Sequence, residues 1–403
     1  MSQPSIPAGP PRPGGSPGPY RSVTALLRRW LLLATVSSVF VLSGLVLATA
    51  LGSELGLRAA GVALLVALLP LGFVVPAFLW LDRYESEPAR YLVFAFGWGA
   101  LVATTVSLIL NTGSLAVLQT LSADGQALAI VAVAPVVEES LKTLGVLLIW
   151  WFRRHEFDGV VDGIVYAGLC AAGFAFAENV LYFGQGFLEA GREGLVAVFV
   201  LRGVLGPFAH PLFTCAAGIA IGYAAHRRGG VQVVVTLFGL GVAIALHAGW
   251  NLSAVIGLDG YVARYLALQL PIFVAAVGFA IWSRRREGRL IAEHLSGYAA
   301  HGWLTPAEVT MLSSLPARRE ARRWASATGG HRAVVAMRSF QDTATELALL
   351  RERMRHGTAP RDARVVELEA LYALGTARAT LVPGPPGRGG PSIGPSAGHQ
   401  SAR

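Results

Sequence analysis

Charged side chains are scarce in this chain of 403 residues. They make up 14 % of it, whereas a soluble globular protein carries about 25 %, so the chain lacks the polar surface that a fold in water needs. Hydrophobic residues make up 54 %, which excludes a wholly disordered chain. The 47 glycines show no triplet period, which excludes collagen. We therefore predict an all-α protein, a polytopic transmembrane helical bundle with polar ends.

Cysteine and lysine are rare as well. The two cysteines, Cys170 and Cys215, lie in apolar stretches, so we expect packing residues there and neither a disulfide framework nor a cysteine-based zinc site. Lysine occurs once, at Lys142, in a chain whose other cationic side chains are arginine. The His-Glu-x-x-His motif of zinc peptidases is absent too.

Long apolar runs set the number of membrane passes. A hydrocarbon core of about 30 Å takes about 20 residues of helix. Eight stretches are long enough, namely residues 31–52, 59–81, 91–111, 128–151, 163–184, 204–225, 231–256 and 261–282. The sixth is the weakest, because Pro207 and Pro211 lie near its start. We therefore predict an eight-span domain over residues 31–282, preceded by a disordered N-terminal tail over residues 1–30.

Arginine alternates from one side of the predicted membrane to the other. Most of it lies in the N-terminal tail, in the second, fourth and sixth loops, and just after the last span. The remaining loops carry only Arg58, Arg192, Arg202 and Arg264. Because positive loops stay in the cytoplasm, we expect both termini there. The second loop also holds Asp82, Glu85 and Glu87, which we expect to be solvated and to cap a helix.

The C-terminal region is strongly basic. Residues 283–403 hold 18 basic and 10 acidic side chains. We expect residues 283–382 to be partly helical, with a capping box at 305–308, and residues 383–403, rich in Pro, Gly and Ser, to be disordered. The positive charge favours anionic lipid as a partner. No nucleic acid is expected, because no motif that reads bases accompanies the charge.

Ionisable side chains inside a membrane span are costly and mark functional sites. Away from the span ends, the predicted spans hold six of them and one amide, namely Glu138, Glu139, Lys142, Glu178, His210, His247 and Asn251. The predicted topology places one group from each of four consecutive spans, Glu138, Glu178, His210 and His247, roughly 9–15 Å below the outer surface, at 1.5 Å per residue. We therefore expect one polar chamber in the outer half of the membrane.

Interhelical hydrogen bonds would explain any one of these groups without chemistry. Two adjacent glutamates are harder to explain in that way, because each needs its own partner or proton. Residues four apart lie on one face of a helix, which places Lys142 beside Glu138 and Thr214 beside His210. Gly163, Gly168 and Gly173 need no chemistry, since close helix packing accounts for them.

The same residues carry a resemblance to the PrsW family of intramembrane proteases, which is related to the CAAX prenyl endopeptidases. The segments that match the family's motifs are Asp82–Pro88 (DRYESEP), Glu138–Lys142 (EESLK), Phe174–Asn179 (FAFAEN), His210–Thr214 (HPLFT) and His247–Asn251 (HAGWN). Each motif alone is weak, but five in order are specific. The resemblance covers about residues 60–285.

This resemblance implies an intramembrane endopeptidase, a hydrolase of peptide bonds, in the bacterial cytoplasmic membrane. The family's known role is the first cut in a membrane-anchored anti-sigma factor, and a chamber in the outer half of the membrane suits such a cut. We therefore expect a membrane-anchored, single-span protein as the substrate. The resemblance does not extend to the identity of that substrate.

Peptide hydrolysis needs an activated water, a stabilised oxyanion and a proton for the leaving amine. We expect Glu138 or Glu139 to be the general base, and favour Glu138 because it shares a helix face with Lys142. The other groups receive the remaining roles: His210, His247 and Asn251 polarise the carbonyl, Glu178 is a second carboxylate or proton relay, and Lys142, Asn179 and Thr214 support them.

Two mechanisms stay open at this point. Catalytic zinc takes three protein ligands and leaves a position for water, and Glu138, His210 and His247, with or without Glu178, would supply them. The related CAAX enzymes suggest a glutamate mechanism without metal as the other choice.

A transporter is the alternative function, in which Glu138, Glu178 and His247 form a proton or cation path. Such a path needs polar residues toward both sides of the membrane, and the inner halves of the fourth to seventh spans have almost none. A non-enzymatic membrane scaffold, whose basic tail recruits partners, is a third class.

Overall fold

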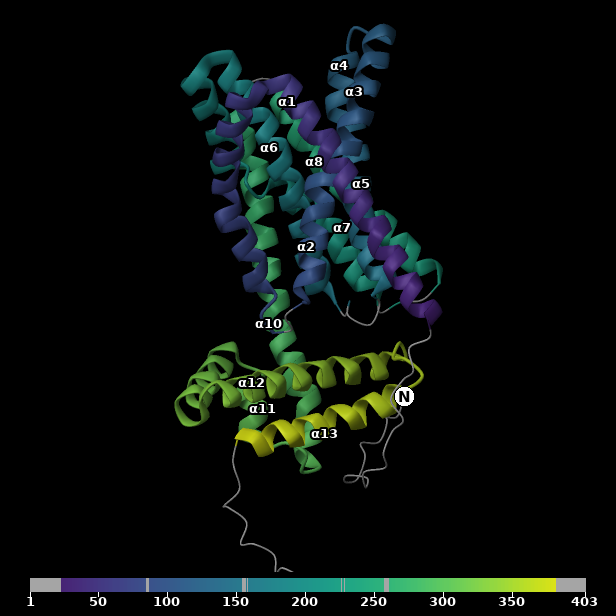
Figure 1. Cartoon of the computed structure of the whole chain (residues 1–403), viewed down its shortest axis with the longest axis vertical. Coiled ribbons are helices and arrows are strands. Elements are labelled where there is room, and N and C mark those ends of the chain that lie inside the picture. Colours follow the sequence, from purple (N-terminus) through teal and green to yellow (C-terminus); the bar gives the residue numbers. More distant parts are fainter. Residues whose placement is uncertain are drawn as a thin grey trace, which may run out of the picture. The chain divides into compact units, whose positions relative to one another are not determined.

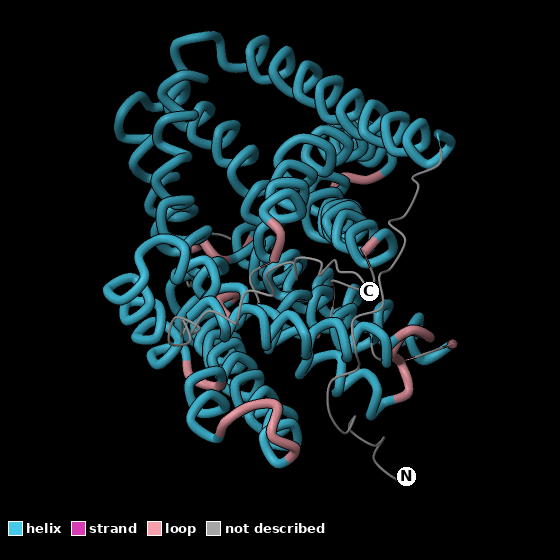
Figure 2. Tube along the Cα trace, turned by 60° about the horizontal axis from the view of Figure 1, so that its bottom comes forward, coloured by secondary structure: helices cyan, strands magenta, loops and turns pink. Residues whose placement is uncertain are grey.

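The computed structural model describes residues 23–84, 87–153, 157, 159–225, 227, 229–256 and 261–381. Within these ranges the regular structure is helical and contains no strand (Figure 2). The all-α prediction is therefore confirmed for the described chain. The predicted disordered ends fall mostly outside it, because residues 1–22 and 382–403 are not described.

The helices form two compact units. The first runs to Leu290, and the second comprises Ile291–Met354 and residues from Ala359 onward. Helix α10 (Leu270–Ala300) contributes to both units. The sequence places the boundary at residue 283, eight residues earlier, because hydropathy falls at the arginines that follow Trp282 while the helix itself continues.

The first unit begins with two helical hairpins, one within α1 and one formed by the helical runs on either side of residues 122–124. Helix α1 (Val23–Leu81) bends at Gly56, whose φ of 70° suits glycine, and so contains the first two predicted spans (Figure 1). The third and fourth predicted spans are each one helical run with a π-helical segment, η, inside it. These runs are α2 (Ala89–Gly97), η1 (Trp98–Ala103) and α3 (Thr104–Leu121), followed by α4 (Gly125–Leu128), η2 (Ala129–Val133) and α5 (Ala134–Phe152).

The sixth predicted span is discontinuous. Helix α6 (Val160–Phe199) bends at Gly191, where φ is 60°, and returns through η3 (Val200–Leu205). The chain leaves the helix at residues 206–208 and resumes it in α7 (Ala209–Ala225). Pro207 explains the break, since proline disfavours helical geometry in the residue before it. The helix that runs back from the Gly191 bend therefore starts about twelve residues before residue 204, the predicted start of the sixth span.

The remaining elements of the first unit are α8 (Gly230–Val255), α9 (Tyr261–Arg264), η4 (Tyr265–Gln269) and the first part of α10.

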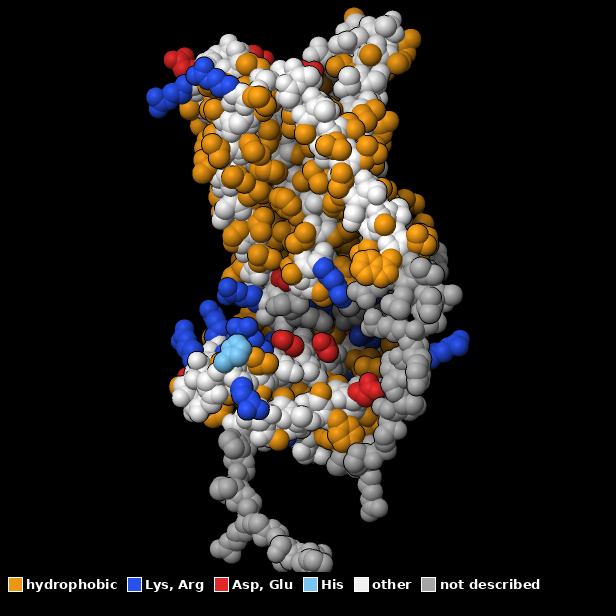
Figure 3. Space-filling model, viewed as in Figure 1, with side chains coloured by type: hydrophobic (Ala, Val, Ile, Leu, Met, Phe, Trp, Pro, Cys, Tyr) orange, Lys and Arg blue, Asp and Glu red, His pale blue; other side chains and the backbone are white. Residues whose placement is uncertain are grey.

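Among the described residues, five helical runs are long and apolar enough to cross a membrane: Trp30–Leu81, Ala89–Leu121, Val160–Ala225, Gly230–Val255 and Val262–Ala300. Several of these runs contain a bend, and the α5 run is excluded by its own charges, so the count of eight passes stays a prediction. Hydrophobic side chains dominate the surface of this unit between its ends (Figure 3), as in an integral membrane protein.

Glycine brings α6 into backbone contact with its neighbours. A Cβ atom on Gly163 would overlap the backbone oxygen of Gly218 in α7, and one on Gly218 would overlap the backbone oxygen of Gly163. On another face of α6, a Cβ atom on Gly173 would overlap the backbone oxygen of Phe96. Small residues permit such close crossings in membranes, so the expected packing role of these glycines is confirmed.

The crossing of α6 and α7 yields a test of the fold. Gly163→Ala is expected to lower the free energy of unfolding by about 1–3 kcal/mol, the usual range for overpacking, because the added methyl group must push two backbones apart. Gly241→Ala in α8 is the matched control, since its Cβ atom would have nothing within 4 Å. Thermal unfolding in detergent measures both, and equal midpoints for the two variants would contradict this packing.

The second unit is a small helical domain around the end of α10. It adds α11 (Pro306–Leu312), α12 (Leu315–His356), which bends at Gly330, and α13 (Ala363–Leu381). The predicted capping box is confirmed: Thr305 Oγ1 accepts from the Glu308 amide at 3.2 Å, and a Glu308 carboxylate oxygen accepts from the Thr305 amide at 2.7 Å. Arg318 is 1 % exposed and donates to the Leu312 carbonyl oxygen, so the centre of this unit contains a hydrogen-bonded charge.

Candidate active site

Four helices of the first unit bring the predicted polar residues into contact. Helix α5 supplies Glu138, Glu139 and Lys142, α6 supplies Glu178, α7 supplies His210 and Thr214, and α8 supplies His247. Glu139, Lys142 and Thr214 are fully buried, and His247 is 2 % exposed. The polar residues that were predicted to lie at one depth therefore form one cluster, in which their side chains are in contact.

The position of Glu178 along α6 differs from the prediction. This helix continues to the bend at Gly191, seven residues past the predicted end of the fifth span. Glu178 thus lies thirteen residues from the bend, about 20 Å along the helix at 1.5 Å per residue. The predicted position of Glu178 is shallower, because hydropathy falls before the helix ends.

Glu139 holds the centre of the cluster. Its Oε1 accepts from Lys142 Nζ at 2.5 Å and from His247 Nδ1 at 2.9 Å, and its Oε2 accepts from Thr214 Oγ1 at 2.7 Å. These donors come from three helices. Glu139 therefore fixes the orientation of its neighbours and has no oxygen left unpaired.

Lys142 pairs with a different glutamate from the one predicted. Its Nζ lies 2.5 Å from Glu139 but 3.9 Å from Glu138 Oε2, so the spacing of four residues does not produce the close pair. The same ammonium lies 3.2 Å from His210 Nδ1. An ammonium can only donate, so Nδ1 accepts, and His210 carries its proton on Nε2, which lies 2.9 Å from Glu178 Oε2.

Glu138 keeps one oxygen free. Asn111 Nδ2 donates to its Oε1 at 3.1 Å, whereas Oε2 is buried and has no hydrogen-bond partner among the described residues. His247 Nε2 lies 3.8 Å from that oxygen. In the neutral imidazole that donates a hydrogen bond from Nδ1 to Glu139, Nε2 of His247 has a lone pair, and two acceptor atoms face each other across this gap. Such an arrangement suits a shared water, proton or cation.

The residues at this gap fit a metal ion. Ligand atoms of Glu138, His210 and His247 lie within 4.8 Å of one another, and this is the one such group in the described parts of the chain. A carboxylate with two imidazoles is a zinc donor set, and a carboxylate behind a liganding histidine, as Glu139 is behind His247, is typical of metal sites. The predicted ligand set is thus assembled, although His210 would have to give up Lys142 or Glu178 to join it.

Arg202 is the main residue that the sequence reasoning missed. It was assigned to an outer loop, but it lies in η3, where it donates to Glu178 Oε2 at 2.7 Å and to Asn179 Oδ1 at 2.8 Å. Its guanidinium also stacks 4.1 Å from the Tyr182 ring centroid. An arginine inside the apolar run around residues 195–205 was the available signal.

The three carboxylates of the cluster differ in how close a cation lies to them. Lys142 lies 2.5 Å from Glu139 and Arg202 lies 2.7 Å from Glu178, whereas the cation at Glu138 is the same Lys142 at the longer distance of 3.9 Å. Asn111, which orients it, was also missed. Asn251 lies apart from these contacts, since its amide donates to the backbone oxygen of Ile130 at 2.9 Å, and its predicted catalytic role stays a prediction.

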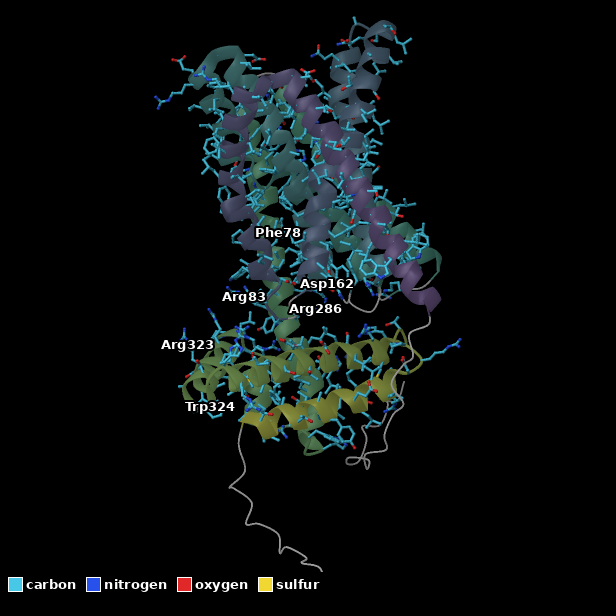
Figure 4. All side chains as sticks on the ribbon, in the orientation of Figure 1. Phe78, Arg83, Asp162, Arg286, Arg323 and Trp324 are labelled. Carbon is cyan, nitrogen blue, oxygen red and sulfur yellow. The ribbon has the colours of Figure 1, made fainter. Side chains whose placement is uncertain are left out.

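The motif in the second loop is buried rather than solvated. Asp82 and Glu87 are 5 % and 7 % exposed. The Glu87 amide donates to Asp82 Oδ2 at 3.1 Å, and Tyr166 of α6 donates to Glu87 Oε2 at 2.5 Å. Burial raises the pKa of Asp82 to about 8. The motif therefore fastens the loop to the start of α6, near Asp162 (Figure 4), and Glu85 lies outside the described residues.

The first unit resembles known proteins in sequence. Residues 87–278 match the sequence profile of the PrsW family intramembrane metalloproteases. The resemblance to the PrsW family is thereby confirmed. The matched stretch contains every member of the polar cluster and leaves out all of α1 and the whole second unit. No solved structure matches the chain.

Individual PrsW proteins are also similar to this chain in sequence. The chain is 32 % identical over 147 residues to Protease PrsW of Geobacillus kaustophilus (strain HTA426), covering 36 % of this chain and 58 % of that protein. It is 29 % identical over 161 residues to Protease PrsW of Clostridioides difficile (strain 630), covering 39 % and 63 %. The chain thus spans about three fifths of the length of these relatives.

The two glutamates are expected to respond differently to substitution. Glu139→Gln removes the charge that balances buried Lys142, which typically costs about 3–5 kcal/mol of stability, and the double variant Glu139→Gln, Lys142→Met should recover part of the loss. Glu138→Gln keeps an oxygen for Asn111 and should change stability by less than about 1 kcal/mol. Thermal unfolding in detergent distinguishes them; a larger loss for Glu138→Gln would reverse the assignment of the central residue.

Proposed function

We propose that this chain is an intramembrane endopeptidase that cleaves a membrane-anchored, single-span protein near the outer face of the membrane. One observation carries the proposal. The free Oε2 of Glu138 faces the lone pair of His247 Nε2 in a buried cluster whose other carboxylates are already paired. The match of this segment to PrsW proteases supports peptide hydrolysis as the reaction.

In this proposal Glu138 is the general base. Its free oxygen takes a proton from the water that attacks the scissile carbonyl carbon and passes that proton to the leaving amine nitrogen. Lys142, 3.9 Å from the same oxygen, supplies positive charge for the negative charge that develops. Glu139 and Asn111 keep the reacting groups in place, because each makes a hydrogen bond to a residue at the gap.

A metal ion held by Glu138, His210 and His247 would supply Lewis-acid chemistry, polarising the carbonyl and activating water. In that form Glu138 serves as a ligand, and Glu178, 2.9 Å from His210 Nε2, is the carboxylate left to move a proton. In both forms the protein excludes bulk water and orients the imidazoles through Glu139 and Glu178.

We also propose that the protein lies in a bacterial cytoplasmic membrane with both termini in the cytoplasm, since arginine alternates between the loops. Its basic second unit would then face anionic lipid. An anti-sigma factor is the substrate class that the family resemblance suggests, and single-span proteins with that topology are the first to examine.

Cleavage of a single-span substrate by purified protein in detergent tests the activity. Glu138→Gln and His247→Ala are expected to lower the rate by roughly 10²–10⁴-fold, the usual effect of losing a general base or an electrostatic group. Glu189→Gln, which removes an exposed carboxylate near the Gly191 bend, is the matched control and should retain full activity. Equal rates in all variants would rule out this site, and ion flux in proteoliposomes without cleavage would favour a transporter.

Chelation separates the two forms of the mechanism. A zinc-dependent enzyme should lose activity with a strong chelator and regain it when zinc is returned. His210→Ala should then abolish both the activity and the stoichiometric zinc measured by elemental analysis. Full activity in protein shown to contain no metal would establish the glutamate mechanism.

A further inference from the structure

An apolar cavity of about 530 Å³ lies beside the polar cluster, within the first unit. Its walls come from α1, η3, α7, α8 and the η4–α10 run, and they include Phe73, Leu212, Leu246 and Phe273. This volume falls in the range of about 300–1,000 Å³ that small-ligand sites occupy. None of the cluster's charged side chains lines it.

One aromatic ring separates the cavity from the cluster. Phe213 lines the cavity, and its ring stacks on His247 with the centroids 5.1 Å apart and the planes 24° apart. The same ring lies 6.0 Å from His210. Gly249 and Trp250, which follow His247 by two and three residues on α8, also line the cavity. An occupant would therefore lie next to the imidazole that faces Glu138.

Gln269 is the polar group of the cavity wall that has no partner. It is the last residue of η4 and lines the cavity. Its side-chain nitrogen and oxygen are both shielded, and neither has a hydrogen-bond partner among the described residues. Leaving such a group unpaired in an apolar environment costs free energy, and rotation about the side-chain bonds can turn the amide toward an occupant.

The chemistry of this amide identifies the kind of occupant that would satisfy it. A carboxamide offers one acceptor and two donors, which match the N–H and C=O groups of a peptide backbone. A lipid acyl chain has neither. In a helical substrate the peptide N–H and C=O groups are hydrogen-bonded to one another. Gln269 would therefore pair with a substrate segment that is no longer helical. A peptidase must also cleave the chain in that unwound conformation.

We propose that this cavity is a specificity subsite, which takes a large apolar side chain next to the scissile bond while Gln269 binds the adjacent peptide group. The proposal rests on the proposed peptidase function. It predicts that substrates with leucine or phenylalanine at that position are preferred over substrates with alanine, because only a large side chain fills the space behind Phe213.

Gly249→Leu tests the subsite by filling it. A Cβ atom at Gly249 has nothing within 4 Å, so the larger side chain can enter the cavity without moving the backbone. With paired substrates, kcat/KM for the leucine substrate should fall at least 10-fold, and kcat/KM for the alanine substrate less than 3-fold. Gly241→Leu, on the same helix and equally unhindered, is the control and should leave both values unchanged.

Gln269→Leu tests the backbone contact. It should lower kcat/KM for both substrates by about 10-fold, the usual effect of one lost hydrogen bond, while the preference for leucine remains. If wild type cleaves but Gly249→Leu leaves the preference unchanged, the subsite is refuted and the peptidase stands.

Photo-crosslinking tests occupancy without cleavage. A substrate carrying photo-leucine at the same position, added to the Glu138→Gln variant, should crosslink to the cavity walls around residues 204–213 or 265–273. Crosslinking there in a protein that never cleaves would support the subsite while the peptidase proposal fails. Crosslinking of a photoactivatable lipid, with none of the substrate, would assign the cavity to lipid and overturn the inference.

Discussion

The ion pair between Glu139 and Lys142 is the interaction on which the rest of the site depends. Both side chains are fully buried, and their charged atoms lie 2.5 Å apart in an otherwise apolar bundle. Neither charge would be tolerated there alone. Through its other contacts Glu139 reaches Thr214 on α7 and His247 on α8, so one carboxylate joins three helices. Because these contacts use both oxygens of Glu139, the buried carboxylate oxygen without a hydrogen-bond partner among the described residues of the cluster is Oε2 of Glu138.

Composition and charge spacing were enough to predict the fold class and most members of the cluster, but not Asn111 or Arg202. Charged residues are so rare in the spans that each stands out, and four helices carrying them at similar depth had to meet. The roles were harder to assign. In a helix, positions three and four residues away are equally close, so Lys142 could reach either glutamate, and the choice of Glu139 depends on Thr214 and His247 across the bundle.

The remaining differences have similar causes. Hydropathy marks where apolar composition ends, not where a helix ends, so the bend at Gly191 and the break before Ala209 were not located. Arg202 was assigned to a loop for that reason, although it completes the pairing of Glu178. Asp82 and Glu87 were expected in water because acidic loop residues usually are, and their burial depends on Tyr166, far away in the sequence.

The charges of α5 also affect how the protein enters the bilayer. An ionised side chain costs roughly 2.5–3.5 kcal/mol at the centre of an inserting helix, and each Val, Leu, Ile or Phe returns only about 0.3–0.6 kcal/mol. With Glu138, Glu139 and Lys142 among its 19 residues, α5 does not qualify as an independent span. Its charges find their partners only where α7 and α8 supply Thr214 and His247. This free-energy balance predicts that α5 enters the bilayer together with the later helices, so that membrane integration and assembly of the site would be a single step.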